Sequence, residues 1–538
     1  MLTKLGLYIN TIQSMKASQI YYRIRKILKL DCSIGCKVSG DLNAVRPIAT
    51  VPELDFDSMF LERFSVEEFM QDKISFLHSS KAFHWDGKWN FEDESALWNF
   101  NLHYFEYLFP IVKTYLDTHD RKYLDKTIFM IESWIKCNPQ SQEGIGWSSY
   151  TIALRLTNWL SYYTAVEKTL GKDFKKKFLI SVHEQYEYLS GHLEKDILGN
   201  HYFENLKAIT LCALFFNDTQ MFKCALKKFK AECKEEILAD GMHFELSPMY
   251  HKLVFEGIIR TAVALKKAGG ADREIESYLQ PMLDAAWSLE EGLDRIPLFN
   301  DSGNNIAKSL QALVDACKVH FNLVPEYKSQ LRESGFYIFK QGVWKLIVDA
   351  GQPGPSYIPG HAHCDAMSFE LFRDGKPVLV NCGTYAYQCK ERNFFRSTAA
   401  HNTVMVNNTE QSQYWGTFRM AKRSSVKIID VSEHEITMEL SDQKGQKVRR
   451  SISLKEEEIL IFDETEKGTI ESYYHFVGKQ IINSKSKQEI VEQWYSTEYG
   501  QKEMIKAIRY LDEYQICVRI CLGEWDDGKN SFYRADCK

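Results

Sequence analysis

The spacing of apolar residues divides the chain into two unlike parts, and the first has helical periodicity. Between about Phe91 and Leu323, apolar residues recur every three or four positions. Within residues 123–135 they share one helical face, at Leu124, Ile128, Ile131, Trp134 and Ile135. Such a stripe is typical of an amphipathic helix with one buried face. Turn signals such as Gly269-Gly270 separate these segments. The pattern predicts many helices without intervening strands and disfavours a doubly wound sheet.

Beyond about Gly335 the period of the apolar residues shortens to that of β-strands. Short runs of β-branched and aromatic residues, bounded by turn residues, are typical of strands. The runs begin at Phe336, Val343, Met367, Val378, Thr403, Val426, Ile436 and Ile452. The tetrapeptide Arg373-Asp374-Gly375-Lys376 is a strong hairpin signal between two of them. The C-terminal part is therefore predicted to be a large all-β unit, a sandwich, that begins between residues 325 and 335.

These patterns predict three regions. Residues 1–90 are interpreted as an N-terminal helical arm, residues 91–330 as a helical domain and residues 331–538 as a β-domain. The arm carries a basic amphipathic segment, QIYYRIRKILKL, at residues 19–30. Binding of this segment to a membrane surface is the less favoured alternative. No Pro-, Gly- or Ser-rich linker separates the two larger regions, so they are expected to pack closely.

The composition is that of a globular protein, and the charge narrows the function classes. The 538 residues carry 67 Lys and Arg against 72 Asp and Glu, a net charge of −5, which gives a nucleic-acid binder no support. The 13 cysteines follow no disulfide framework and are interpreted as thiols.

No apolar run approaches the roughly 20 residues that span a bilayer, so no integral membrane segment is expected. No convincing signal peptide is present. The expected compartment is the cytoplasm if Met1 is the native start, and the periplasm or the exterior if the chain is processed. The sequence leaves the oligomeric state open.

The most informative stretch for chemistry is residues 360–371, GHAHCDAMSFEL. Alternation along an extended chain would place His361, His363 and Asp365 on one face. Two imidazoles and a carboxylate on one face suit a metal or another polar site. A solvated turn with two ordinary histidines explains this stretch alone equally well.

Three further clusters of polar and aromatic residues add to this stretch. They are 380–387 with 396–404, 199–205, and 245–251. Each alone has a structural alternative: Asn200 could cap a helix, and Tyr250 could be a core tyrosine with a satisfied hydroxyl.

Taken together, the motifs resemble those of the heparinase II/III-like polysaccharide lyases. The strongest match runs from His361 to Val404, and Asn200-His201 and the 247–250 motif match in order and spacing. The aromatic segment 98–105 also fits, and the resemblance covers about residues 90 to 480. It implies an α+β multidomain fold, in which an incomplete α/α toroid precedes an antiparallel β-sandwich. That fold agrees with the change of period.

The resemblance also implies a reaction. Members of the family cleave uronic-acid-containing polysaccharides by β-elimination: the C5 proton is removed and the C4–O bond breaks, which leaves an unsaturated uronate. The implied partner is an acidic polysaccharide or oligosaccharide. By resemblance, Asn200 and His201 stabilise the charge that develops on the carboxylate, and Tyr250 and His361 transfer protons. The expected substrate contacts are Tyr387, Arg396 and the stacking platform Trp147.

A structural zinc ion lies near the site in related lyases, and its ligands map onto His363, Asn381 and His401. The family commonly has Asp at the middle position, and a neutral amide is a poorer zinc ligand than a carboxylate. One structural zinc that orients the loop carrying His361 is expected. The alternative is a hydrogen-bonded cluster of the same three side chains without metal.

Three functions are weighed on these residues. A lyase acting on an acidic glycan leads. The missing signal peptide favours a role in the cell's own capsule or exopolysaccharide metabolism, or in the processing of imported oligosaccharides. Asn381 motivates the alternative of a non-catalytic glycan-binding or polysaccharide-assembly protein that retains the lyase fold. A hydrolase would need a carboxylate pair, for which Glu204 and Glu245 are the candidates.

Overall fold

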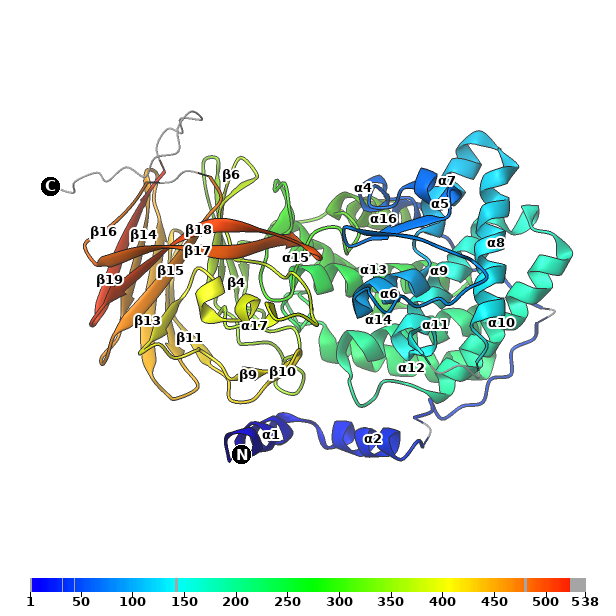
Figure 1. Cartoon of the computed structure of the whole chain (residues 1–538), viewed down its shortest axis with the longest axis horizontal. Coiled ribbons are helices and arrows are strands. Elements are labelled where there is room, and N and C mark those ends of the chain that lie inside the picture. The colour runs from blue at the N-terminus through cyan, green and yellow to red at the C-terminus, as the bar shows by residue number, and fades with distance from the viewer. Residues whose placement is uncertain (1, 31, 43, 141–143, 479–480, 523–538) are drawn as a thin grey trace.

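A helical domain and a β-domain lie side by side in the computed structural model, which describes residues 2–30, 32–42, 44–140, 144–478 and 481–522 (Figure 1). The N-terminal half of the chain builds the helical domain, and the C-terminal half builds the β-domain. Two further helices, α1 (Leu2–Ser14) and α2 (Ala17–Ile27), run below both domains in this view. The expected order of a helical region followed by an antiparallel β-domain is confirmed.

The helical domain is assembled around one long, buried helix. Its described helices are α6 (Ala96–Tyr104), α7 (Leu108–Thr118), α8 (Arg121–Cys137), α9 (Ser149–Val166), α10 (Lys172–Gly191), α11 (Gly199–Phe215), α12 (Thr219–Glu236), α13 (Pro248–Lys267), α14 (Arg273–Glu276), α15 (Leu279–Glu290) and α16 (Leu310–Phe321). The stripe expected on α8 is buried at Leu124, Ile131 and Trp134. Helix α11 packs against α9, α12 and α13 and is buried along nearly its whole length, polar side chains included.

The first 90 residues are built differently from the expected helical arm. Short helices α3 (Pro52–Asp55), α4 (Ser58–Leu61) and α5 (Val66–Met70) precede a hairpin of β1 (Lys73–Phe76) and β2 (Ser79–Ala82). Val51, Phe69 and Trp85 from this region are buried in the same core as the long helices. Helices of about one turn are too short to show a repeat in the spacing of apolar residues. The sequence pattern therefore did not separate this region from α1 and α2. The arm proper therefore consists of α1 and α2.

The described part of the β-domain contains two large antiparallel sheets and a two-stranded one of β9 (Tyr414–Trp415) and β10 (Arg419–Met420). The six-stranded sheet has the order β11 (Ser425–Val431), β12 (Glu435–Ser441), β13 (Lys447–Leu454), β14 (Glu458–Glu464), β19 (Gln515–Cys521), β16 (Ile481–Ser484). The nine-stranded sheet has the order β17 (Lys487–Glu498), β18 (Gln501–Asp512), β15 (Ile470–Phe476), β7 (Lys376–Leu379), β6 (Phe369–Arg373), β5 (Trp344–Asp349), β4 (Phe336–Gln341), β3 (Gln330–Leu331), and β8 (Val404–Val406) also pairs with β15. Apolar side chains of both sheets share one core.

The hairpin expected at residues 373–376 joins β6 to β7. Arg373 pairs with Lys376, and the two residues between them have positive φ angles, 47° at Asp374 and 81° at Gly375. Positive φ at both central positions is the type I′ geometry that matches strand twist, and Asp-Gly is a preferred sequence for it.

Two apolar clusters join the domains. In one, Leu246 and Leu289 of the helical domain pack with Ile347 of β5, in the nine-stranded sheet. In the other, Met249 at the start of α13 packs with Tyr499 beyond β17. Because buried apolar side chains join the domains, residues from both are held in one fixed arrangement at the junction.

The arm bridges the two domains. On the β-domain side, the Tyr8 ring lies edge-on to Trp415 at 4.8 Å, and the Trp415 indole donates a hydrogen bond of 3.0 Å to Thr11 Oγ1. On the helical side, Lys16 Nζ lies 2.7 Å from Glu235, and the Gln19 amide donates to the Ile197 carbonyl at 3.2 Å. Among the described residues, no helix combines the length and apolar character that crossing a membrane requires.

Candidate active site

A cleft of about 490 Å³ at the domain junction brings together most residues of the sequence-based hypothesis. The helical domain contributes Asn200, His201 and Tyr250, and the β-domain contributes His361 and Tyr387. Helices α1 and α2 of the arm, with one residue between them, also line the cleft, at Thr11, Ser14, Met15, Gln19 and Arg23. Residues more than 350 positions apart in sequence therefore face the same space.

Asn200 lies in the first turn of α11, where an unusual backbone orients its amide. Leu198 and Gly199 both have positive φ, 67° and 58°. The Asn200 Nδ2 donates to Glu245 Oε2 at 2.9 Å and lies 3.4 Å from His361 Nε2. Its Oδ1 is buried without a hydrogen-bond donor among the described residues. A buried acceptor without a donor is unfavourable by about 1–3 kcal/mol. Toward a carboxylate only the Nδ2 of Asn200 can donate, and it pairs with Glu245 in the free protein.

His201 follows Asn200 and is held by a carboxylate. Its Nδ1 lies 3.1 Å from Glu194 Oε1, and its ring lies against Tyr150 with centroids 4.4 Å apart. Burial alone would disfavour charge on His201, but the Glu194 carboxylate and its hydrogen bond raise the pKa of His201 above its ordinary value. The imidazolium form is thereby favoured beside the cleft.

Gly199 gives a test of how tightly this turn is built. A Cβ at residue 199 would lie 2.6 Å from Glu245 Oε1, and the backbone is left-handed there. We expect Gly199→Ala to lose about 1–2 kcal/mol from the left-handed backbone and more from the clash, with displacement of Glu245 and Asn200. Urea unfolding and turnover would measure both effects.

The control for that substitution is Gly269→Ala, because Gly269 also has positive φ (91°) but open space around a new Cβ. It isolates the backbone contribution. Equal losses of stability in the two variants, with turnover unchanged in both, would contradict a tight turn that positions Glu245.

Tyr250 lines the cleft and is the first of three hydrogen-bonded tyrosines. It lies in the first turn of α13, whose N-cap Ser247 accepts a hydrogen bond from the Tyr250 backbone N–H at 3.2 Å. Its hydroxyl shares a hydrogen bond of 2.9 Å with Tyr387, which shares one of 2.7 Å with Tyr499. The Tyr250 ring packs on His361 with centroids 3.9 Å apart. Burial raises the pKa of Tyr250 well above its ordinary value, so the free protein holds a neutral phenol, not the phenolate.

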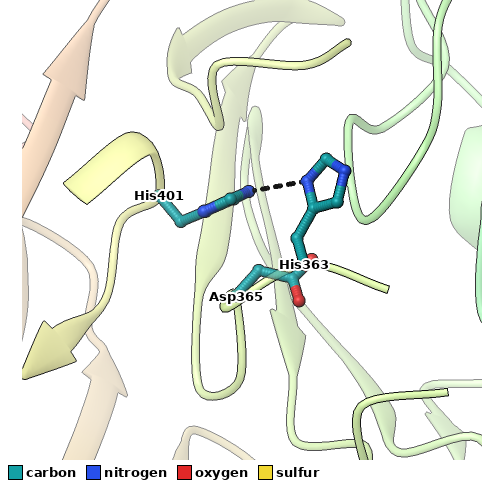
Figure 2. A group of neighbouring side chains, drawn as sticks. All are labelled: His363, Asp365 and His401. Atoms are coloured by element: carbon teal, nitrogen blue, oxygen red, sulfur yellow. Dashed lines mark hydrogen bonds between the residues drawn. The ribbon is translucent and has the colours of Figure 1, made fainter. Parts of the chain in front are cut away.

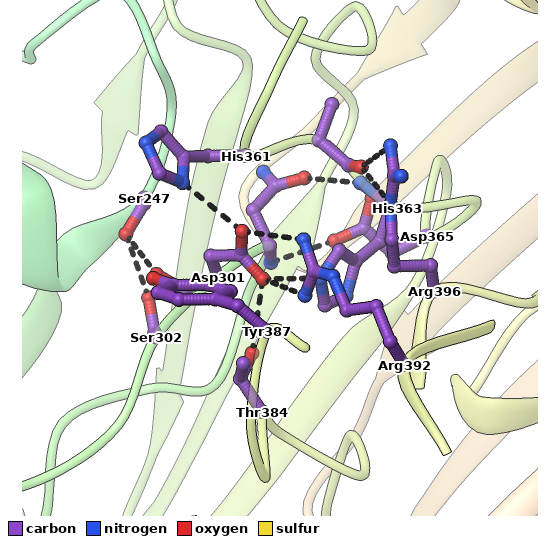
Figure 3. Close-up of polar contacts among 12 residues, drawn as sticks. Ser247, Asp301, Ser302, His361, His363, Asp365, Thr384, Tyr387, Arg392 and Arg396 are labelled. Carbon is purple, nitrogen blue, oxygen red and sulfur yellow. Dashed lines mark hydrogen bonds and ion pairs between the residues drawn. The ribbon is translucent and has the colours of Figure 1, made fainter. Parts of the chain in front are cut away.

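Asp301 organises the β-domain side of the site (Figure 3). Its carboxylate receives hydrogen bonds from His361 Nδ1 at 3.0 Å and His363 Nε2 at 2.9 Å, and both guanidinium ends of Arg392 pair with it. Thr384 donates to it at 3.2 Å. Burial opposes the charge, but Arg392 and the two imidazoles hold the pKa of Asp301 well below its usual range. The ionised carboxylate accepts only, so Nδ1 of His361 carries a proton, and Nε2 presents a lone pair when the ring is neutral.

The histidines of the expected metal site face each other (Figure 2). His363 Nδ1 lies 3.2 Å from His401 Nε2. The outer nitrogen of His401 donates to the Ser397 carbonyl at 2.8 Å, and that of His363 donates to Asp301. Both inward nitrogens therefore present lone pairs when the rings are neutral. Burial lowers the pKa of His363 to about 4, which disfavours a proton between them.

The third residue of this cluster is Asp365, where the sequence-based expectation was Asn381. Ligand atoms of His363, Asp365 and His401 all lie within 4.8 Å of one another. The Asn381 oxygen instead accepts from the Asn402 backbone N–H at 3.1 Å, and its amide donates to Ser368. The family pattern has a carboxylate at the middle position, where this chain has Asn381, and a carboxylate is instead present two residues after His363.

Two expected substrate contacts do not line the cleft. Arg396 is fully buried and donates to backbone carbonyls, among them those of Ala362 and Thr417, so it holds loops together. Trp147 is buried, and its indole donates to the Asn138 carbonyl at 3.1 Å. The cations that line the cleft are Arg23 of the arm and Arg419.

Sequence reasoning missed Asp301, Glu194 and Glu245 as positioning residues. Glu245 was named only as half of a hydrolase pair with Glu204, but Glu204 binds Lys207 at 2.5 Å and does not line the cleft. Asp301 follows Asn300, which has positive φ (55°), in an irregular loop with no strand or helix period. Its role is revealed by its contacts with His361, His363 and Arg392, which lie 60 to 91 residues away.

Two family models match the chain over nearly all of its length. The Heparinase II/III N-terminus model covers residues 10–328, and the Heparinase II/III-like, C-terminal model covers residues 324–516. The chain belongs to the heparinase II/III family. The resemblance drawn from the motifs is therefore confirmed and extends beyond the 90–480 region that carried it.

Curated members of the heparinase II/III family are distant in sequence. A heparin-sulfate lyase of Pedobacter heparinus is 25% identical over 437 residues, which cover 74% of this chain and 64% of that protein. A heparin-sulfate lyase of Bacteroides stercoris is 24% identical over 467 residues, 76% of this chain and 68% of that protein. The chain thus spans a little under two thirds of the first relative's length.

Solved heparinase structures share the fold. A crystal structure of heparinase III matches with a TM-score of 0.65 at 16% identity, covering 93% of this chain and 90% of that one. A heparan sulfate lyase of Pedobacter heparinus matches with a TM-score of 0.56 at 18% identity, covering 94% and 87%. The expected helical toroid followed by a β-sandwich is confirmed.

Proposed function

We propose that this member of the heparinase II/III family is a polysaccharide lyase that cleaves an acidic, uronic-acid-containing glycan by β-elimination. The observation that carries the proposal is the convergence of Asn200, His201, Tyr250 and His361 on one cleft from two domains. β-Elimination needs a group that withdraws charge from a carboxylate, a base for the C5 proton and an acid for the leaving oxygen. The four residues offer these groups along one cleft, and Asn200 and Tyr250 both contact His361.

Asn200 and His201 are the proposed partners of the uronate carboxylate. As the C5–H bond breaks, negative charge accumulates on that carboxylate, and preorganised donors stabilise it. The raised pKa of His201 favours the imidazolium, a stronger donor than the neutral ring.

His361 and Tyr250 are the proposed base and acid. Since Asp301 holds the proton on Nδ1, the Nε2 lone pair of His361 is available to accept the C5 proton. The neutral Tyr250 phenol, with its raised pKa, donates a proton to the departing O4. Tyr387 shares a hydrogen bond with that phenol and supports the phenolate that forms.

The test is a screen of acidic polysaccharides for products with the ultraviolet absorbance of an unsaturated uronate. A lyase produces this absorbance, and a hydrolase produces reducing ends without it. A binding or assembly protein, the alternative function, retains glycan and produces neither. Action of the protein on the exopolysaccharide of its own cell stays a prediction. The same screen tests it when capsule fractions are included as substrates.

We also propose one structural zinc ion bound by His363, His401 and Asp365. The donor set fits, because two imidazoles and a carboxylate are ordinary zinc ligands. Two Zn–N bonds of about 2.0–2.1 Å at a tetrahedral angle separate the nitrogens by about 3.3 Å, close to the 3.2 Å between these two. Both rings are oriented from behind, by Asp301 and the Ser397 carbonyl, as metal-bound imidazoles usually are. Zinc there would hold the loop that carries His361.

Metal analysis tests the ligand set. After exposure to zinc and gel filtration, the parent should retain about one zinc per chain, and His401→Ala and Asp365→Asn should retain far less. Asn381→Ser should retain the metal, because its oxygen accepts from Asn402. The exposed His434→Ala is the surface control. Equal, near-zero zinc in parent and variants would refute the proposal, and loss in Asn381→Ser alone would restore the ligand set of the family pattern.

A further inference from the structure

Exposed apolar side chains are concentrated on the arm. Of the 22 large hydrophobic residues exposed among the described residues, nine lie between residues 5 and 30. Isolated exposed apolar side chains are normal on a soluble protein, but a contiguous group marks an interaction surface. The arm is thus an unusual part of this molecule's surface.

The exposed apolar residues form one stripe on each helix of the arm. On α1 they are Leu5, Tyr8, Ile9 and Ile12, and on α2 they are Tyr21, Ile24, Ile27 and Leu28. These spacings of three, four and seven place each set on a single helical face. Ile27 is 74% exposed and Leu28 is 62% exposed, so the described part of the chain leaves most of their surface uncovered.

The opposite face of the same helices contacts the protein. Gln19 of α2 is buried and donates to the Ile197 carbonyl, and Thr11 of α1 accepts from the Trp415 indole. Arg23 and Met15 line the cleft. Both helices lie along the outside of the two domains (Figure 1). Their apolar stripes are largely exposed, and Tyr8 at the edge of the α1 stripe also contacts Trp415.

The charge of the arm is opposite to that of the rest of the chain. Residues 1–30 carry six Lys or Arg and no Asp or Glu, whereas the other 508 residues carry 61 Lys and Arg against 72 Asp and Glu. Arg25 borders the apolar stripe, since its guanidinium donates to the Tyr21 hydroxyl at 3.3 Å. Lys29 is exposed between Leu28 and Leu30. Basic residues beside an apolar helical face favour an anionic lipid surface.

We propose that the outer face of α1 and α2 docks on an anionic membrane surface, with both helices lying in the plane of the headgroups. Apolar faces of such helices insert about 5–10 Å into the boundary between headgroups and acyl chains. Basic residues next to them gain about 1 kcal/mol each from the anionic leaflet. Because the inner faces of the same helices line the cleft, docking places the cleft next to the headgroup region.

Other occupants fit this face less well. A second copy of the chain would bring one basic arm against another, with no acidic residue among residues 1–30 of either copy. Lys16 pairs with Glu235, and Arg23 and Lys26 pair with Asp196, so the other basic residues of the arm set this repulsion. An acidic glycan would match the charge, but it would leave the apolar stripes in water. An anionic bilayer matches both the charge and the apolar faces.

The experiment is co-sedimentation of the full-length protein with phosphatidylcholine vesicles, with and without phosphatidylglycerol. We expect binding to the anionic vesicles only, weakened by added salt. Ile24→Glu should reduce that binding by at least about tenfold, because it removes apolar burial and adds a repelled charge. The control Ile490→Glu replaces an isoleucine of β17 with the same 52% exposure and should bind as the parent does.

Several results would overturn the proposal. These are no binding to anionic vesicles, equal weakening by Ile490→Glu, and a dimer in light scattering that Ile24→Glu dissociates. If Ile24→Glu unfolds at a lower temperature than the parent, Lys29→Glu takes its place, since Lys29 is exposed. Vesicle binding is read without substrate, so its outcome is independent of the lyase proposal.

Discussion

Tyr250→Phe should reduce turnover on an acidic glycan by about 10²–10⁴-fold, the usual contribution of a positioned acid or base. The substitution removes only the hydroxyl that faces the cleft, whose described hydrogen-bond partner is Tyr387. Tyr387 keeps its hydrogen bond to Tyr499, so the variant should fold normally. Glycan affinity should change little because Asn200 and His201 are untouched. The rate of ultraviolet-absorbing product, with affinity measured separately by calorimetry, separates chemistry from binding.

Tyr514→Phe is the matched control, since Tyr514 is exposed and lies far along the chain in the β-domain. It should retain the parent's rate. A Tyr250→Phe variant that turns over substrate as fast as the parent would remove this phenol from the mechanism and leave His361 to carry both proton transfers.

Asp301→Asn should cost about 3–5 kcal/mol of stability, as expected when a buried ion pair loses one partner. The buried Arg392 would keep its charge without a carboxylate, and the imidazoles of His361 and His363 would lose their acceptor. Turnover should fall as well, since His361 Nδ1 would no longer be held as the donor. Urea unfolding monitored by tryptophan fluorescence measures the loss. Asp430→Asn, at an exposed position of β11, should change stability by no more than about 0.5 kcal/mol.

The same substitution should change the acid sensitivity of the fold. Asp301 has a lowered pKa in the folded protein, because Arg392 and the imidazoles outweigh the opposing effect of burial. Its stabilising contribution is therefore complete above an ordinary aspartate pKa of about 3.9 and is lost as the pH falls below that value. The free energy of unfolding of the parent should fall more steeply below about pH 4 than that of Asp301→Asn. Identical acid slopes in both proteins would contradict the role assigned to this carboxylate.

The candidate site was predictable where its residues lie in local motifs. Asn200 and His201 adjoin each other, Tyr250 follows a helix cap, and His361 and His363 lie two residues apart, so short stretches of sequence carry them. Arg396 failed as a substrate contact because sequence does not report burial: the motif is present, but its guanidinium points at backbone carbonyls.

For the proposed metal ligands too, sequence did not report which side chains meet in the fold. The family pattern pointed to Asn381, and alternation along an extended strand placed Asp365 on the face of His361 and His363. The stretch from Gly360 to Ser368 is a loop in which Met367 has positive φ, so strand alternation does not apply to it. The fold instead brings Asp365 beside His401, 36 positions later in the chain.

The sequence by itself determined the two-part architecture, because the spacing of apolar residues records whether a segment buries one face of a helix or one face of a strand. It also determined the family and the residues in its motifs. Only the tertiary structure decided that Asp301 joins His361, His363 and Arg392, and that α1 and α2 line the cleft on one face and expose apolar residues on the other. Charge pairing and burial depend on which distant segments meet, and no local period encodes that.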